Sequence, residues 1–155
     1  MAVLDLFTLY NIEASIGTSQ QPSGGTWTYA PLGAGLDNVS EALNEVVQQY
    51  FFLGDKGFAR NHVTGMAPSF TFTGRRVIGD AAQEYIFGNK YKLDTNRASS
   101  FKLVIVNNSG DAPTTKTLTV DCTICNIQEW SGSSTDDSAI SFEIRFDGAP
   151  EVADS

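Results

Sequence analysis

The stretch SFTFTGRRVIGDAAQEYIF, residues 69–87, changes its hydrophobic period halfway along. Phe70 and Phe72 alternate with threonines, which is typical of a strand with one buried face. Beyond Gly74 and two arginines, apolar residues recur at positions 81, 82, 85 and 86, which is a helical spacing. The sequence therefore predicts a strand that ends at Gly74 and a short helix after it.

Asp80 and Gln83 mark the start of this helix. Asp80 has a side chain suited to an N-cap, and a glutamine three residues later completes a capping-box pattern. We therefore expect a helix over about residues 81–87. So abrupt a change from strand to helix suggests either an active site or a contact between subunits.

The composition indicates one mainly β domain. The chain has 155 residues, which is the length of a single domain, and its 10 phenylalanines and 14 glycines favour strands joined by turns. Further strands are predicted at 2–11, 26–32, 58–66, 68–73, 100–108, 116–130 and 139–146. Strands in this number with one helix predict a β-sandwich or barrel with a flanking helix.

Residues 39–53 allow two interpretations. Apolar side chains at 39, 42, 43, 46, 47, 50 and 51 follow the pattern of an amphipathic helix. The alternative is strand, turn and strand, with the turn near Asn44, because VVQQYFFL is rich in β-branched and aromatic residues. Periodicity alone favours the helix.

Charge is distributed unevenly along this acidic chain. The net charge of -8 divides into -6 before Lys56, +5 over residues 56–116 and -7 over residues 117–155. The pattern suits either a solvated acidic surface or copies whose basic middle meets the acidic ends of another copy. Net acidity argues against wrapping DNA by neutralising its phosphates. The N-terminus lacks the basic start of a secretory signal and no apolar run reaches membrane-spanning length, so we expect synthesis in a cytoplasm and no membrane partner.

The sequence contains no convincing catalytic, metal or cofactor site. Cys122 and Cys125 lie in an alternating strand pattern, where residues three apart point to opposite faces, so a zinc or redox pair is not expected. His62, the single histidine, has no nucleophile near it in the sequence. Arg75 and Arg76 suit a phosphate ligand, a surface pair or the basic half of an interface. We expect an assembly protein that is not an enzyme and holds no cofactor.

The stretch VTGMAPSFTFTGRRVIGDAAQEYIFGNKYKLDTNRASSFK, residues 63–102, resembles the major tail proteins, or tail tube proteins, of long-tailed, siphovirus-type bacteriophages. GDAAQEYIF is its most specific part, and the later segments DCTICNI and ISFEIRFDGAPEV resemble the closing strands of that family. The resemblance extends over residues 36–152. It favours strand, turn and strand over residues 39–53, against the periodicity.

The resemblance implies a structural subunit of a phage tail tube in the virion, made and assembled in the bacterial host cytoplasm. Residues 1–155 would form a single tail tube domain, and its copies would form hexameric rings that stack around a lumen. The lumen would hold the tape-measure protein and conduct phage DNA during ejection. A tail terminator and baseplate or distal tail proteins would be the other partners.

Several surfaces are predicted from this reading. The helix and the residues before it are expected at a junction between subunits: Arg75, Arg76, Asp80, Gln83 and Tyr85. The alternative is a helix that only covers its own sheet. Residues 15–25 and 148–155 are expected to be an assembly loop and a C-terminal arm that order on ring stacking.

An acidic lumen wall would repel DNA weakly, and the candidates for it are Glu41, Glu45, Asp121 and Glu143. The rival function is a carbohydrate- or receptor-binding β-sandwich module of a virion, with Trp27, Trp130 and the tyrosines as stacking platforms.

Overall fold

A computed structural model describes residues 7–18, 26–107 and 114–154. Its strands are β1 (Ile12–Gly17), β2 (Tyr29–Pro31), β3 (Leu36–Ala42), β4 (Val46–Phe51), β5 (Ala59–Gly65), β6 (Ser69–Arg75), β7 (Ala98–Asn107), β8 (Thr114–Gln128), β9 (Ala139–Phe146) and β10 (Glu151–Asp154). One α-helix, α1 (Ala81–Gly88), and the short 3-10 segments η1 (Leu9–Asn11), η2 (Leu53–Asp55) and η3 (Asp94–Arg97) complete the described elements.

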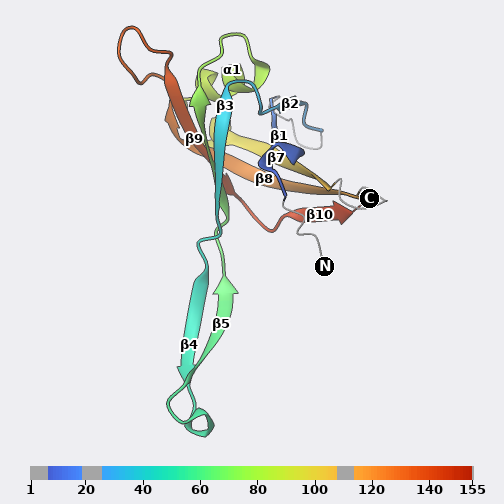
Figure 1. The fold of residues 1–155 in the computed structure, drawn as a ribbon, viewed down its shortest axis with the longest axis vertical. Coiled ribbons are helices and arrows are strands. Elements are labelled where there is room, and N and C mark those ends of the chain that lie inside the picture. The colour runs from blue at the N-terminus through green and yellow to red at the C-terminus, as the bar shows by residue number, and fades with distance from the viewer. Residues whose placement is uncertain (1–6, 19–25, 108–113, 155) are drawn as a thin grey trace, which may run out of the picture.

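Eight strands form one antiparallel sheet in the order β2-β1-β7-β8-β9-β6-β3, with β10 paired to β8 beside β9. β4 and β5 form a separate two-stranded ribbon. Figure 1 shows this ribbon extending away from the sheet, while α1 lies at the opposite end of the molecule. The fold is mainly β with one flanking helix, as the sequence predicted.

The core lies on one face of the large sheet, because apolar residues alternate along its strands. Phe70 and Phe72 of β6, Phe101 of β7 and Phe142 of β9 form its aromatic centre, with ring centroids 5.3 to 6.4 Å apart. α1 covers part of this core with Ala82, Ile86 and Phe87, which are all buried. Within the described residues, no helix is long and apolar enough to span a bilayer.

At Gly74 the pairing of β6 with β3 ends, and the backbone of β3 comes too close there for any larger residue. A Cβ atom at Gly74 would lie 2.2 Å from the carbonyl oxygen of Gly35 and 2.6 Å from the Cα atom of Leu36. Gly35 has a φ of +75°, a conformation that favours glycine. The register between β3 and β6 shifts at this place, next to Leu36.

Residues 39–53 form strand, break and strand, so the interpretation that followed the family resemblance is confirmed and the helical periodicity is wrong. β3 ends at Ala42, and β4 begins at Val46 after Asn44, which has a φ of +49°. The break continues the chain into the ribbon and does not reverse it, since β3 pairs with β6 and β4 pairs with β5. The apparent helical stripe is made of residues that belong to two different strands and the break between them.

The predicted ends of the chain differ from the observed ones. A strand was expected over residues 2–11, but residues 1–6 lie outside the described part, residues 9–11 form η1, and the first of the described strands begins at Ile12. Of the predicted assembly loop 15–25, residues 15–17 belong to β1 and residues 19–25 are outside the described part. The segment 148–155 was expected to be a C-terminal arm that orders on assembly. In the described part, Glu151–Asp154 form β10, which pairs with β8 of its own chain where β9 leaves that edge of β8 free, and the assembly role of the segment stays a prediction.

Candidate assembly surfaces

The ribbon of β4 and β5, with residues 52–58 between the strands, is called the arm here, and residues 52–58 are its tip. The residues of β4 are all exposed, and β5 is exposed over most of its length. The exposed apolar side chains of the arm are Val46, Val47, Tyr50, Phe51, Phe52, Leu53, Phe58 and Val63. At the tip, the Leu53 side chain is fully exposed and that of Phe58 is 78% exposed.

The arm holds a defined shape although it lacks a core. Arg60 donates two hydrogen bonds to the Asp55 carboxylate, at 2.7 and 3.0 Å, and the rings of Tyr50 and Phe52 stack at 5.7 Å. At its base, Asn44 donates a hydrogen bond to the Ala67 carbonyl oxygen at 2.9 Å. This bond links the segment that enters the arm to the segment that leaves it.

An exposed apolar surface of this extent is typical of a contact with another molecule. A two-stranded ribbon alone is marginally stable in water, so a partner that covers the arm would stabilise it. The arm was not predicted from the sequence as a functional element. The sequence feature that indicates the arm is the GDKG turn, residues 54–57, which lies between Phe51, Phe52 and Phe58. A polar turn flanked by aromatic residues places apolar side chains at an exposed tip.

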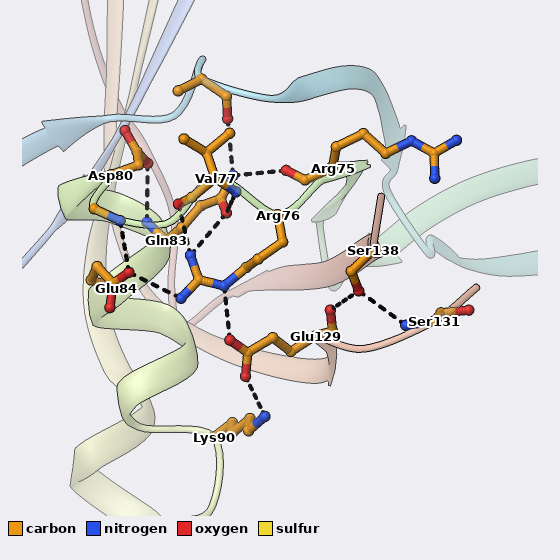
Figure 2. Close-up of polar contacts among 12 residues, drawn as sticks. Arg75, Arg76, Val77, Asp80, Gln83, Glu84, Lys90, Glu129, Ser131 and Ser138 are labelled. Carbon is orange, nitrogen blue, oxygen red and sulfur yellow. Dashed lines mark hydrogen bonds and ion pairs between the residues drawn. The ribbon is translucent and has the colours of Figure 1, made fainter. Parts of the chain in front are cut away.

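At the other end of the molecule, Arg76 holds together the loop before α1, the helix and the end of β8. Its guanidinium donates to the Glu129 carboxylate at 2.8 Å and to Glu84 at 3.1 Å, and Lys90 forms a second ion pair with Glu129 (Figure 2). The side chains of Arg76 and Glu129 are only 6% and 7% exposed. The cluster is therefore a buried ion network that fixes α1 to the sheet.

Gln83 forms the second fixing point of the helix. Its amide oxygen accepts from the Val77 N–H at 2.8 Å, and its amide nitrogen donates to the carbonyl oxygens of Ala34 and Arg75, at 2.9 and 3.1 Å. The side chain is 1% exposed. Figure 2 shows these groups converging between α1 and the end of β6.

The capping box predicted at Asp80 is half correct. The Asp80 carboxylate accepts from the Gln83 N–H at 3.2 Å, which makes Asp80 the N-cap. The Gln83 side chain does not return to the Asp80 N–H, which donates to the Val77 carbonyl oxygen instead. The Gln83 side chain points inward because it makes hydrogen bonds with three backbone groups. Two of them belong to Arg75 and Val77, and the third to Ala34, which lies just before β3.

The five residues expected at a subunit junction all make contacts within their own chain. Arg76 and Gln83 are buried, and Tyr85 donates to the Ala98 carbonyl oxygen at 3.2 Å. Arg75 and Asp80 are less covered; Arg75 donates to the Asp137 carbonyl oxygen at 3.1 Å. These contacts show the helix covering its own sheet, and a junction role for the five residues stays a prediction.

Replacing Gln83 with leucine is expected to reduce the free energy of unfolding by about 2 to 3 kcal/mol. The change leaves the Val77 N–H and two carbonyl oxygens without their partner. An unsatisfied group costs about 1 to 3 kcal/mol when it is fully buried. These three belong to residues that are exposed overall, so each should cost about 1 kcal/mol or less. Urea unfolding followed by circular dichroism measures the loss. Gln128→Leu, at an exposed site on β8, is the matched control and should change stability by less than about 0.5 kcal/mol. Equal effects of the two changes would contradict the role given to Gln83.

The large sheet also has a polar face, opposite the core, that is rich in hydroxyl groups. Across it, Ser40, Thr71 and Glu143 are neighbours in β3, β6 and β9, and Thr73 lies opposite Ser141. Glu143 is held by Arg145 and Asn126, and hydrogen bonds from Arg145 are the main cause that lowers the pKa of Glu143. At this place the face is lined by hydroxyl groups, and the charge of Glu143 is compensated by Arg145.

The four acids predicted for a lumen wall fall into two groups. Asp121 and Glu143 belong to the polar face, because they alternate with the buried residues Cys122 and Ile144. Glu41 lies opposite Phe70, on the core side of β3, and Glu45 lies at the base of the arm. Asp121 and Glu143 could therefore line the same wall, and a lumen role for any of the four acids stays a prediction.

The two cysteines lie in β8 as free thiols, one buried and one half-buried. Burial raises the pKa of Cys122 well above its usual range and also raises that of Cys125. Thiols in this state are poor nucleophiles and metal ligands. The two thiols therefore lie on opposite faces of β8, as the alternating pattern predicted.

Free strand edges are the last feature that suits assembly. Among the described strands, β3 pairs only with β6 and β10 only with β8, so each has an edge without a partner strand. An unpaired edge is a ready template for a strand of another chain.

The two tryptophans proposed as sugar-stacking platforms in the rival hypothesis lie in different environments. Trp27 is half-buried and packs so closely on Gly17 that a Cβ atom there would lie 2.5 Å from its ring. Trp130 is 62% exposed, with the Lys90 ammonium 5.4 Å from the ring centroid. Trp27 is thus used for packing and is not available as a stacking platform.

Comparison with solved structures identifies the fold. A chain of the tail of an empty gene transfer agent particle, solved with helical refinement and C6 symmetry, is 13% identical, with 96% of this chain and 99% of that one covered and a TM-score of 0.68. A chain of the SPP1 tail tube is 15% identical, with coverage of 97% and 80% and a TM-score of 0.66. A chain of the tube-terminating cap of the anti-feeding prophage is 15% identical, with coverage of 100% and 94% and a TM-score of 0.58.

No protein-family model and no curated protein matches the chain. The similarity in structure extends over nearly the whole chain at low identity, so it shows a shared fold. The chain has the fold of tail tube proteins, and the fold predicted from the resemblance is confirmed.

Proposed function

We propose that this protein is a structural, non-enzymatic subunit of a phage tail tube, located in the virion, whose copies form hexameric rings that stack around a lumen. The observation that carries the proposal is the exposed apolar arm on a body with the tail tube fold. The arm points away from its own sheet, so its apolar tip needs a surface on another molecule (Figure 1).

Two further features support rings. The free edges of β3 and β10 suit strand pairing between neighbours, and a head-to-tail contact whose rotation closes gives a ring. The chain of the gene transfer agent tail, which has the same fold, belongs to an assembly with C6 symmetry. Six copies per ring is therefore the number that we propose.

The polar face of the sheet is the surface that we assign to the lumen. Around Thr71 and Glu143, hydroxyl groups and an ion pair whose two charges offset each other leave no net positive charge, which favours passage of DNA without adhesion. The partners that follow are phage DNA and the tape-measure protein in the lumen, with a tail terminator and baseplate or distal tail proteins at the two ends.

Purified protein at rising concentration is expected to form rings and then tubes of uniform width. Negative-stain microscopy with class averages along the axis measures the symmetry, and sedimentation measures the concentration at which tubes appear. Sixfold averages with a central hole are the expected result. A chain that stays monomeric at millimolar concentration, with a normal circular dichroism spectrum, would contradict the proposal.

A further inference from the structure

A second apolar surface of the described chain is a groove between η1, β1 and β3. It has a volume of about 420 Å³ and is lined mainly by apolar side chains, among them Leu9, Ile12, Leu32, Leu36 and Val39. The groove follows the free edge of β3, where the sheet order ends and the strand has no further partner in the described sheet. Leu9 is 53% exposed at its rim.

We propose that this groove is the receptor for the arm tip of a second copy of the chain, an inference that rests on the proposed function. The tip cannot fill the groove of its own chain, because the arm extends away from the body that contains it (Figure 1). Each copy therefore presents one donor and one receptor at separate places. Contacts of this kind are head-to-tail, and they build an open stack when the rotation does not close.

Size and chemistry of the two surfaces agree. The tip presents Phe52, Leu53 and Phe58, with side chains 56%, 100% and 78% exposed, around a short 3-10 turn. The groove, at about 420 Å³, lies within the size range of pockets that bind apolar groups, which is roughly 300 to 1,000 Å³. Burying them would remove apolar surface from water on both copies at once.

Charge also favours this pairing. Asp37 is the single acidic side chain among the residues that line the groove. Residues 52–60 of the arm contain Asp55, Lys56 and Arg60, a net charge of +1, and Asp55 is already paired with Arg60. Lys56, in a left-handed conformation at the tip, is left as the free cation of the tip among the described contacts. A carboxylate at the groove and an ammonium at the tip complement each other across the contact.

Thiol cross-linking tests the contact directly. The variant carries Leu9→Cys and Leu53→Cys together with Cys125→Ser, and a short bis-maleimide is added to preformed tubes. Each chain then links its tip to the groove of one copy and its groove to the tip of another, so a ladder of covalent multimers is expected. The two single-cysteine variants are the controls and should give no ladder. Absence of the ladder in tubes of the double variant would overturn the assignment.

A charge swap gives an independent readout. Asp37→Lys and Lys56→Asp should each raise the critical concentration for tubes about tenfold, and the two together should restore it to within about threefold of the unchanged protein. Both positions are exposed, so neither change should unfold the subunit. If the double variant shows the product of the two single effects, the pairing is wrong.

The outcomes separate the groove from the proposed function. Tubes that are lost with Leu53→Asp but form normally with Leu9→Asp and Asp37→Lys would overturn the groove and leave the tube function standing. If another segment of the same chain fills the groove, Leu9→Asp should lower the melting temperature and leave stacking unchanged, which would also overturn the assignment. A chain that forms neither rings nor tubes would overturn both.

Discussion

Replacing Leu53 with aspartate is expected to abolish tubes and leave the subunit folded. The Leu53 side chain is fully exposed at the arm tip, so a carboxylate there meets only water in the isolated chain. In an assembled tube the same carboxylate would be buried in an apolar contact, which costs several kcal/mol per copy when it is not paired. Because each ring repeats the contact in every subunit, the cost multiplies along the stack.

The measurement combines negative-stain microscopy with sedimentation and thermal unfolding. Leu53→Met is the matched control: it keeps the size and apolar character of the side chain and should keep the tubes. Rings or monomers with an unchanged melting temperature are the expected state of Leu53→Asp. Normal tubes from this variant would show that the tip lies outside every subunit contact, and the main support for the proposed function would be lost.

The second large effect is expected at the buried ion network. Glu129→Gln keeps the size of the side chain but removes the negative charge between Arg76 and Lys90, whose side chains are 6% and 15% exposed. Breaking a buried pair in this way costs about 3 to 5 kcal/mol, because an uncompensated charge stays behind. At roughly 2 to 4 °C per kcal/mol for a chain of this size, the melting temperature should fall by about 10 °C.

Glu84→Gln is the control for this change. Glu84 pairs with the same arginine but its side chain is 49% exposed, so water already solvates much of it. Its loss should cost less than about 1 kcal/mol. Equal losses from the two variants would show that burial does not strengthen the network.

The same network makes a pH-dependent contribution to stability. Burial alone opposes the charged form of Glu129, but hydrogen bonds and charge from Lys90 and Arg76 outweigh it and lower the pKa. A pKa that is lower in the folded state gives stability that is fully present above the unfolded pKa and is lost as the pH falls through the folded value. The stability difference between the unchanged protein and Glu129→Gln should therefore be largest near neutral pH and narrow in acid. A difference that does not change between pH 7 and pH 3 would contradict this.

Local patterns of the sequence were sufficient for the elements whose partners are close in the chain. The strand through Phe70 and Phe72, the N-cap at Asp80 and the short helix follow from alternation, capping and helical spacing. The opposite placement of Cys122 and Cys125 followed from the same alternation. In these segments, propensity and tertiary contacts favour the same structure.

Local sequence patterns gave the wrong prediction where contacts with another segment determine the structure. Residues 39–53 have helical spacing, but β3 is paired by β6 and β4 by β5, and these cross-strand hydrogen bonds outweigh the local preference. Gln83 suited a capping box, but loop backbone groups around Val77 and Ala34 drew its side chain inward. Neither partner is visible in the spacing of a single segment.

The sequence by itself determined a mainly β chain with one short helix, a strand followed by that helix within residues 69–87 and a net charge of -8, because these depend on residue type and local period. The tertiary structure alone decided that Glu129 lies buried between two cations and that Asp121 and Glu143 share a face without Glu41. It also decided that the aromatics around the GDKG turn extend into solvent on an arm. The physical reason is that strand register sets which side chains meet, and register is a property of pairs of segments far apart in the chain.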